Sequence, residues 1–386
     1  MLLAVVFAGC GRAADEPKIP TEFVFGLYGA IAKEKPTENV TVSPYCAELL
    51  LDFVRSGAAG ETKTEIDKVL GRTEAKKWTE SVADSPLTTA AALWTQQNYS
   101  IQPTFLETAR KEFGASAEQA DFTNNAADAV RRINAWCSEK TKGKITSLFD
   151  SFDATTRCVL AGAIYFAADW KVPFNKDLTQ DADFTLLDGK VIKTKIMSRS
   201  STMKYSETDE TLIVELPYKN EGYAMVLLLP KDSAQFTGWE SKLTADTLKT
   251  LREGMKPVQV DLRMPRFSVK SETVLNETLK QLGIPTAFSR DADFTKISGQ
   301  KDLYLSEVRQ KTFVKVDETG TEAAAVTGAV GAIKMAIQTK PFYANRPFLY
   351  LVVKNNDILF FGRFAKPEAE VPFVDPGLDG EGGAFN

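Results

Sequence analysis

Histidine is absent from the 386-residue sequence. Its absence excludes the most common general base, the usual zinc ligand and every serine or cysteine nucleophile that an imidazole activates. The sequence also contains no P-loop, no G-x-S-x-G motif and no cluster of metal-binding residue types. An enzyme is therefore not expected, and neither a metal nor a cofactor is predicted.

Cysteine is scarce, and the four cysteines show no C-x-x-C spacing. A chain of this length buries a core large enough to fold without a disulfide framework. We therefore expect Cys46, Cys137 and Cys158 to be buried free thiols.

A large excess of charge of one sign is also missing, because the net charge is −4 and Lys and Arg are spread along the chain. This distribution lacks the basic patch by which proteins bind nucleic acid, so no nucleic-acid partner is expected. With 44% hydrophobic and 25% charged residues, the composition is typical of a globular protein with a large core.

Long hydrophobic runs are missing as well, since no segment reaches the roughly 18 apolar residues of a membrane helix. The apolar run from Leu2 to Ala8 resembles the end of a secretory signal, although no basic residue precedes it. Its continuation into Gly9 and Cys10 also resembles a bacterial lipobox, in which Cys10 would carry a lipid anchor. A trimmed eukaryotic signal or a misassigned start is the alternative. The prediction is a secreted, extracellular protein or a membrane-anchored lipoprotein that faces the exterior or the periplasm.

Beyond this N-terminal segment the chain shows no repeat and no long flexible linker before Pro367. A single domain over residues 21–367 is the simplest interpretation, preceded by a signal remnant and linker over residues 1–20. Residues 368–386 are rich in acidic residues and contain no basic residue, which predicts a flexible, solvated tail.

Apolar spacings of three and four predict helices over residues 124–140 and 271–282. The residues expected to face the core are Val130, Ile133 and Cys137 in the first helix and Leu275, Leu279 and Leu282 in the second. Hydrophobic segments predict strands over residues 211–216, 223–230, 258–267, 348–354 and 358–364. Several of these strands are apolar on both faces, which predicts an α/β protein of the α+β type, with large sheets covered by helices.

The segment 317–342 does not fit an ordinary element. Residues 323–333 hold five Ala, two Gly, two Val, one Thr and one Ile, a composition that forms weak helices and buries little area as a strand. Yet Thr321, Ala323, Ala325 and Thr327 are small, uncharged and two residues apart, which is the period of one strand face. The segment is therefore either an Ala-rich linker or an exposed loop that could slot between two existing strands.

The flanks of this segment, DETGTEAAA at 317–325 and PFYANRPFL at 341–349, resemble the reactive-loop hinge and the following strand of the serpin family. Further blocks resemble the family in the same order along the chain, so that the resemblance spans residues 21–367. These blocks are NVTVSP at 39–44, GAAGET at 57–62, LAGAIYF at 160–166 with Trp170 and the Pro-Phe pair at 173–174, ELPY at 215–218, the strand at 225–230 and FGR at 361–363.

The resemblance implies a metastable serpin fold with three β-sheets, about nine helices and an exposed reactive-centre loop. It also implies a monomeric suicide inhibitor that forms a covalent acyl complex with a target serine protease. After cleavage, the loop would insert into the main sheet as an extra strand and distort the protease. The catalytic residues would then belong to the target, and this chain would not be an enzyme.

The resemblance further implies which residues carry inhibition. The family's usual loop length places the reactive bond at Lys334–Met335, where a basic residue suits trypsin-like proteases. Met335 as the bait would instead indicate a chymotrypsin- or elastase-like target, and a non-inhibitory substrate, carrier or chaperone is the other alternative. The implied hinge residues are Glu318, Gly320, Thr321, Glu322, Ala323, Ala324, Ala325 and Thr327.

Two departures from the family pattern concern the gate and a polysaccharide site. A polar cluster of Ser, Asn and His typically gates the central sheet in the family, but the matching positions here are Cys46, Gly162 and Gln310. The resemblance implies that Ser43 belongs to the same gate region. The gate must therefore be held by other contacts, while Trp170 marks the breach above it. The stretch of chain over residues 71–87 is shorter than is usual in the family, which shortens the helix on which some relatives bind sulfated polysaccharide. Heparin binding is therefore not expected. A solvated face is predicted instead for four lysines: Lys63, Lys68, Lys76 and Lys77.

Overall fold

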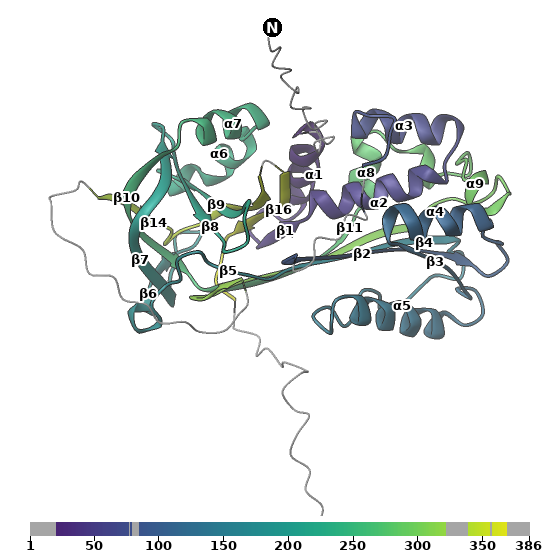
Figure 1. Ribbon diagram of the computed structural model, residues 1–386, viewed down its shortest axis with the longest axis horizontal. Coiled ribbons are helices and arrows are strands. Elements are labelled where there is room, and N and C mark those ends of the chain that lie inside the picture. The colour runs from purple at the N-terminus through teal and green to yellow at the C-terminus, as the bar shows by residue number, and fades with distance from the viewer. Residues whose placement is uncertain (1–20, 77, 79–84, 322–338, 356, 369–386) are drawn as a thin grey trace, which may run out of the picture.

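Figure 1 shows the computed structural model, which describes residues 21–76, 78, 85–321, 339–355 and 357–368. Within these residues there are nine α-helices and three β-sheets, as the resemblance implied. The helices are α1 (Thr21–Glu34), α2 (Pro44–Ser56), α3 (Gly60–Leu70), α4 (Pro103–Phe113), α5 (Ala126–Lys140), α6 (Phe236–Lys242), α7 (Ala245–Glu253), α8 (Asn276–Leu282) and α9 (Thr295–Ser298), with three short 3-10 helices η1 (Lys176–Leu178), η2 (Ser233–Gln235) and η3 (Thr286–Phe288).

The largest sheet has nine strands in the order β1-β16-β15-β9-β8-β7-β10-β14, with β6 paired to β7. Its neighbours are antiparallel except for β10 and β14, which run parallel. The strands are β1 (Val40–Val42), β6 (Gln180–Thr185), β7 (Val191–Glu207), β8 (Thr211–Pro217), β9 (Tyr223–Pro230), β10 (Lys256–Pro265), β14 (Lys340–Tyr343), β15 (Phe348–Lys354) and β16 (Asp357–Phe364).

The second sheet has five strands in the order β11-β12-β4-β2-β3. Its middle strand β4 is buried at every position. The pair β4 and β12 is parallel and in register from Val159 opposite Glu307 to Tyr165 opposite Phe313. We call this contact line the seam. The strands are β2 (Leu87–Gln96), β3 (Ser116–Ala120), β4 (Cys158–Phe166), β11 (Phe267–Val274) and β12 (Glu307–Val316), and the third sheet consists of β5 (Ala168–Asp169) and β13 (Gly320–Thr321).

Helix α2 is buried along almost its whole length and contacts both β4 and β16. Its start is fixed locally, because the Ser43 hydroxyl accepts a hydrogen bond from the Cys46 N–H at 3.0 Å and Pro44 occupies the first helical turn. The five-stranded sheet is covered on its other face by α5 (Figure 1). Small side chains on β2 and β4 allow this close approach: Ala90, Ala92, Ala161 and Ala163.

The structure confirms the predicted strands with one change. The strand predicted over 258–267 is divided, because β10 ends at Pro265 and β11 starts at Phe267. The helix predicted over 124–140 corresponds to α5, whose buried face comprises Ala129, Ile133, Trp136 and Cys137 while Val130 is only half-buried. Cys46, Cys137 and Cys158 are buried free thiols, as predicted.

The helix predicted over 271–282 was wrong in its first part. Residues 271–274 belong to β11, where burial alternates along the strand and the backbone pairs with β12. The helix begins only at Asn276. The alternating burial along residues 267–274 has the period of two of a strand, and pairing with β12 continues through Val274, so the helical spacing of the leucines applies only from Leu275 onward.

Among the described helices, none combines the length and the apolar character needed to cross a membrane. The predicted signal remnant and most of the predicted acidic tail lie outside the described residues, as does Cys10.

Candidate functional site

The hinge predicted from the sequence begins in a tight turn after β12. The Asp317 carboxylate accepts hydrogen bonds from the N–H of Thr319 at 2.9 Å and of Gly320 at 3.2 Å. The Asp317 N–H in turn donates to the Gly320 carbonyl at 2.9 Å. These bonds reverse the chain direction without any helix, so the segment leaves β12 and returns along β5.

Gly320 is required by close packing against β5. A Cβ atom at this position would lie 2.2 Å from the Ala168 carbonyl oxygen and 2.5 Å from the Asp169 Cα. Both contacts are with backbone, which cannot move aside as a flexible side chain would. Glycine therefore lets the hinge approach the chain that follows β4.

The hinge already makes strand pairs just beyond the C-terminal end of the seam, where Tyr165 lies opposite Phe313. Gly320 lies opposite Asp169 and Thr321 opposite Ala168, in an antiparallel ladder. Beside this ladder, the N–H of Trp170 donates to the Thr319 carbonyl at 2.9 Å. The hinge backbone is thus hydrogen-bonded to the segment that continues from β4.

Trp170, predicted to mark the breach, lies directly at this hinge. Its indole is fully buried and stacks on Tyr218, with ring centroids 4.5 Å apart. Its Nε1 donates a hydrogen bond to the Asp317 carbonyl at 2.9 Å. The ring therefore joins the start of the hinge to the apolar layer below it.

Glu318 is held by residues that the sequence did not single out. Its carboxylate is almost completely buried and accepts a hydrogen bond from the Thr179 hydroxyl at 2.8 Å. Arg266 forms an ion pair with it at 3.7 Å. Arg266 is the single residue between β10 and β11, and this interruption of a hydrophobic run was the only signal available in the sequence.

The four predicted gate residues meet at one point beneath the seam. Gln310 lies opposite Gly162 in the register of β12 and β4. The Gln310 amide accepts from the Ser43 N–H at 2.9 Å and donates to the Ser43 carbonyl at 2.8 Å. The Ser43 hydroxyl donates to the Leu359 carbonyl at 2.6 Å. One glutamine thus links β12 to the start of α2.

Gly162 and Cys46 fill the rest of the gate by close packing. A Cβ on Gly162 would lie 2.8 Å from the Cys46 Sγ and 2.8 Å from a Leu50 methyl group. Burial raises the pKa of the Cys46 thiol to about 12, so the thiol stays protonated and unreactive at neutral pH. Shape and a single amide therefore replace the usual polar cluster here.

We predict that replacing Gln310 by leucine will lower the free energy of unfolding by about 2 to 4 kcal/mol. The leucine would leave the buried N–H of Ser43 without a partner, at a cost of about 1 to 3 kcal/mol. It would also remove one of the two hydrogen bonds that the Ser43 carbonyl accepts, worth about 1 kcal/mol, while the bond from the Ala47 N–H at 3.0 Å remains. Urea unfolding of the intact protein measures the change. The exposed Gln300→Leu variant is the control, and equal stabilities of the two variants would contradict this role.

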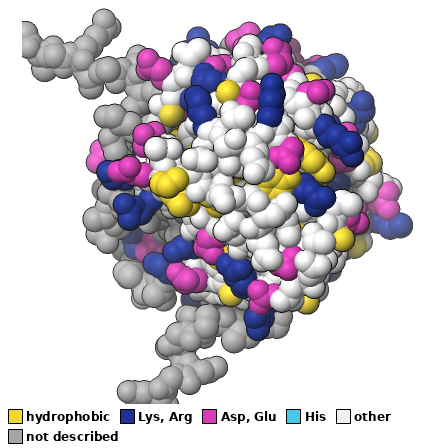
Figure 2. All heavy atoms as spheres, turned by 90° about the vertical axis from the view of Figure 1, so that its right-hand side faces the viewer, with side chains coloured by type: hydrophobic (Ala, Val, Ile, Leu, Met, Phe, Trp, Pro, Cys, Tyr) yellow, Lys and Arg dark blue, Asp and Glu magenta, His cyan; other side chains and the backbone are white. Residues whose placement is uncertain are grey.

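The predicted solvated face of lysines was wrong for Lys76. This residue is buried, its Nζ lies 3.4 Å from Asp357, and it lies over the rings of Tyr45 and Trp78. Lys63 forms an ion pair with Asp67, Lys68 is exposed and Lys77 lies outside the described residues. On the face that includes α3, the basic and acidic side chains of the described residues are interspersed (Figure 2). This mixture is unlike a sulfated-polysaccharide site.

Lys76 also lies beside an acidic stripe on α2, since its backbone N–H donates to the Asp52 carboxylate at 3.2 Å. Glu48 and Asp52, one helical turn apart, are both fully buried. Arg55 of the same helix lies 3.0 Å from Asp52, and the segment after α3 supplies further partners. Arg72 lies 2.9 Å from Glu48 and also contacts Asp52, while Trp78 donates its Nε1–H to Asp52 at 2.9 Å. The short connection after α3 is therefore fastened to α2 by charge.

We predict that Glu48→Gln will flatten the dependence of stability on pH. Burial raises the pKa of Glu48 from 4.5 to about 7, although Lys76 and Arg72 act in the opposite direction. The folded protein therefore holds this proton more tightly than the unfolded chain, and stability falls as pH rises from about 4.5 to 7.

Glutamine removes this loss, so the variant should be more stable than the wild type above pH 7 by up to about 3 kcal/mol. Denaturant unfolding between pH 5 and 8 measures the difference. Glu107→Gln, at an exposed position, is the matched control. A difference between Glu48→Gln and wild type that does not change with pH would contradict the prediction.

Three sheets, the two larger of which pack on α2, and a predicted hinge at the end of a parallel seam form the architecture of the serpin fold. A family model described as serpin (serine protease inhibitor) matches residues 18–367. The chain belongs to the serpin family.

Individual relatives cover most of the chain. The leukocyte elastase inhibitor of Homo sapiens is 33% identical over 371 residues, which span 90% of this chain and 98% of the relative. The crystal structure of Serpin48 from the insect Tenebrio molitor, described as a highly specific serpin, has a TM-score of 0.82 at 30% identity and covers 90% of this chain and 97% of that one. Human thyroxine-binding globulin in complex with thyroxine has a TM-score of 0.81 at 25% identity, with coverage of 90% and 97%.

The comparisons confirm the predicted family and fold, and the family description fits an inhibitor of proteases. The roles proposed for the hinge, gate and breach residues remain predictions. The other predicted residues of the loop lie outside the described residues. They are Glu322, Ala323, Ala324, Ala325, Thr327, Lys334 and Met335.

Proposed function

We propose that this protein inhibits a trypsin-like serine protease by covalent trapping. The protease cleaves Lys334–Met335, and the freed segment then inserts between β4 and β12. The observation that carries the proposal is the ladder of Gly320 and Thr321 against β5, just beyond the C-terminal end of the seam. The first hinge residues thereby have the antiparallel direction that an inserted strand would continue.

The energy for trapping comes from the strand that is gained. An inserted strand of about ten residues forms backbone hydrogen bonds on both sides, each worth about 0.5 to 1.5 kcal/mol net. The sum is on the order of 10 kcal/mol, enough to distort a protease active site. Small side chains at alternate positions of the segment, Thr321, Ala323, Ala325 and Thr327, suit insertion into a sheet whose faces are already covered.

Lys334 is the proposed bait, because a basic residue before the scissile bond suits the acidic pocket of trypsin-like proteases. Incubation with trypsin should give a complex that survives SDS, together with release of a peptide that begins at Met335. Lys334→Ala should remove both products. Clipping of the loop by trypsin without a stable complex would refute the trapping mechanism.

Met335 as the bait is the alternative for specificity. The similarity to a protein named leukocyte elastase inhibitor favours testing elastase beside trypsin. Mass spectrometry of the peptide released by each protease distinguishes the two, because cleavage after Met335 yields a peptide that begins at Ala336.

A non-inhibitory carrier is the second candidate function. The fold is also similar to thyroxine-binding globulin, which was crystallised with thyroxine. A carrier need not insert its loop, so it predicts no gain in stability after loop cleavage.

We also propose export, with Cys10 as the lipidated residue. The support is the apolar run from Leu2 to Ala8 followed by Gly9 and Cys10. The mass of the N-terminal peptide of the protein purified from its own cells tests this. A peptide that starts at residue 11 or later, or an unmodified Cys10, would exclude lipidation.

A further inference from the structure

Where β7, β10 and β14 lie side by side, the face of the sheet that points away from the core is open to solvent. Burial alternates along the middle of β10, so that Val260 and Leu262 face the core while Asp261 and Arg263 point outward. The register of β14 places Tyr343 beside Arg263. We call this surface the outer face, and its main residues are Ser200, Thr202, Gln259, Asp261, Arg263 and Tyr343.

Tyr343 is the large exposed side chain of the outer face, and its ring is held in place. Its hydroxyl donates to the Asp261 carboxylate at 2.6 Å, and this hydrogen bond raises the pKa of the Tyr343 phenol, which stays protonated. The guanidinium of Arg263 lies 4.5 Å from the centre of the ring and donates to the same carboxylate at 3.2 Å. An aromatic ring that is already fixed loses little conformational freedom when a partner packs on it.

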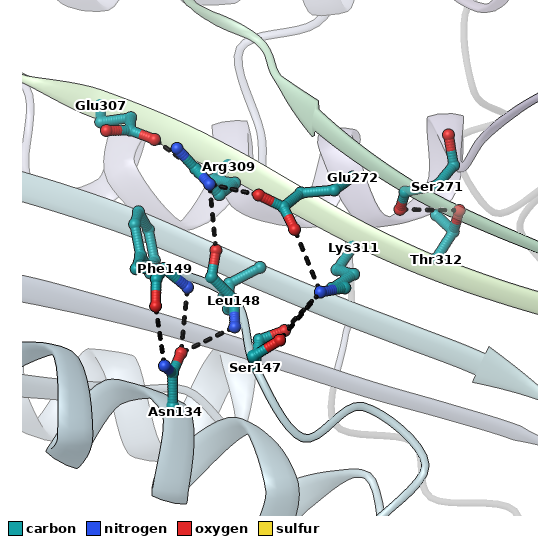
Figure 3. Close-up of polar contacts among 10 residues, drawn as sticks. All are labelled: Asn134, Ser147, Leu148, Phe149, Ser271, Glu272, Glu307, Arg309, Lys311 and Thr312. Atoms are coloured by element: carbon teal, nitrogen blue, oxygen red, sulfur yellow. Dashed lines mark hydrogen bonds and ion pairs between the residues drawn. The ribbon is translucent and has the colours of Figure 1, made fainter. Parts of the chain in front are cut away.

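Arg263 keeps hydrogen-bond donors for a partner. Within the part of the chain that the structure describes, its side chain donates to Asp261 alone, and about half of it is exposed. The cations of β12 differ, because Arg309 and Lys311 are bound on several sides by carboxylates and carbonyls of the protein itself (Figure 3). A guanidinium has five N–H donors in a planar fork, so Arg263 can bind an oxygen of another molecule without releasing Asp261.

The outer face lies close to the place where a protease would be held. Lys340, the first residue of β14, follows Met335 by five residues, which span at most about 18 Å. A protein domain of about 200 residues has a radius of gyration of about 16 Å. A protease bound at the proposed reactive bond therefore reaches the outer face with its own surface.

We propose that the outer face is a second contact surface for the target protease, on which Tyr343 packs against a surface loop of the protease and Arg263 binds an oxygen acceptor of that loop. The inference rests on the proposed function, because it takes a protease engaged at Lys334 as the partner. Aromatic residues and arginine contribute most of the binding energy of protein interfaces.

The surroundings of these two side chains suit such a contact. Ser200, Thr202 and Gln259 carry no charge, so a partner covers them without removing an ion from water. The reactive bond would then set the class of protease, while the outer face would select among proteases of that class.

The experiment measures binding of the intact full-length protein to trypsin whose catalytic serine is replaced by alanine. This inactive trypsin isolates the contact, because neither cleavage nor insertion takes place. We expect Tyr343→Ala to raise the Kd about tenfold and Arg263→Ala to raise it about fivefold, as for central residues of an interface. Tyr343→Phe keeps the ring and loses only the bond to Asp261, so its Kd should stay within about twofold of the wild type.

Two variants elsewhere on the surface are the matched controls. Leu106 is another exposed apolar side chain, on α4 at the opposite end of the molecule from β14 (Figure 1), so Leu106→Ala is the control for Tyr343→Ala. Arg131 is exposed and pairs with Asp128 three residues away, so Arg131→Ala is the control for Arg263→Ala. Neither control should change the Kd.

Equal Kd values for Tyr343→Ala and wild type would overturn the outer face as a contact surface and leave the trapping mechanism intact. It is also overturned if Tyr343→Phe weakens binding as much as Tyr343→Ala, because the hydrogen bond within the protein would then matter and not the ring. Binding of inactive trypsin without an SDS-stable complex from active trypsin would refute trapping and leave the outer face in place. If the wild type does not bind inactive trypsin, the outer face and the trypsin-like specificity both fail.

Discussion

Replacing Thr321 by arginine is expected to turn the protein from a trap into an ordinary protease substrate. Thr321 is the second residue of β13 and lies opposite Ala168, which is buried. It is also the first of the alternate small positions that must pass between β4 and β12. A guanidinium carried into this covered sheet without a partner costs several kcal/mol, and the first step of insertion would bear that cost.

The measurement is the number of inhibitor molecules cleaved for each protease molecule inactivated. This number should be near one for the wild type and should rise at least about tenfold for Thr321→Arg, because insertion slowed by only 1.4 kcal/mol already loses tenfold to hydrolysis. Thr339→Arg is the matched control. It introduces the same charge at an exposed position on the far side of the proposed scissile bond. Trapping by Thr321→Arg with unchanged efficiency would contradict the role of the hinge.

The pattern behind the predicted hinge is local. Small residues two positions apart are visible in the sequence, and the structure pairs the first of them, Thr321, with Ala168. The reason for Gly320 was not visible, since it depends on the backbone of β5, which is more than 150 residues earlier in the chain. Contacts between distant segments decide such cases.

The gate was predictable in position and not in chemistry. Motif matching identified Cys46, Gly162 and Gln310, and the structure brings them together with Ser43. Gln310 forms hydrogen bonds with both polar groups of the Ser43 backbone. These bonds depend on which residue of β12 lies beside the start of α2, and the sequence alone does not determine that packing.

Buried charge was the least predictable feature. Lys76 was expected to be solvated, as an isolated lysine usually is. Its burial follows from Asp357 and Tyr45, which lie far from it in the sequence, and from Trp78, two residues away. Glu48 and Asp52 lie among the apolar residues of α2, whose own Arg55 pairs with Asp52. They were a signal for further buried cations nearby, because a buried carboxylate needs a partner.

Cleavage of the loop is expected to raise the melting temperature by about 10 to 20 °C. Before cleavage, β12 is bonded directly to β4 in a parallel pair. Afterwards the inserted strand would pair antiparallel with both strands, which replaces one ladder by two and adds on the order of 10 kcal/mol. In a domain of this size each kcal/mol raises the melting temperature by about 1 to 2 °C.

Circular dichroism of the intact and the trypsin-cleaved protein measures this shift, with cleavage at the loop verified by mass. Thr321→Arg provides the internal control, because its loop can be cut at the same bond but is hindered from inserting. Its melting temperature should change little on cleavage. A wild-type protein that melts at the same temperature before and after cleavage would favour the carrier function, since the seam would then have stayed closed. A rise of equal size in both proteins would mean that relief of loop strain, and not the gain of a strand, provides the stability.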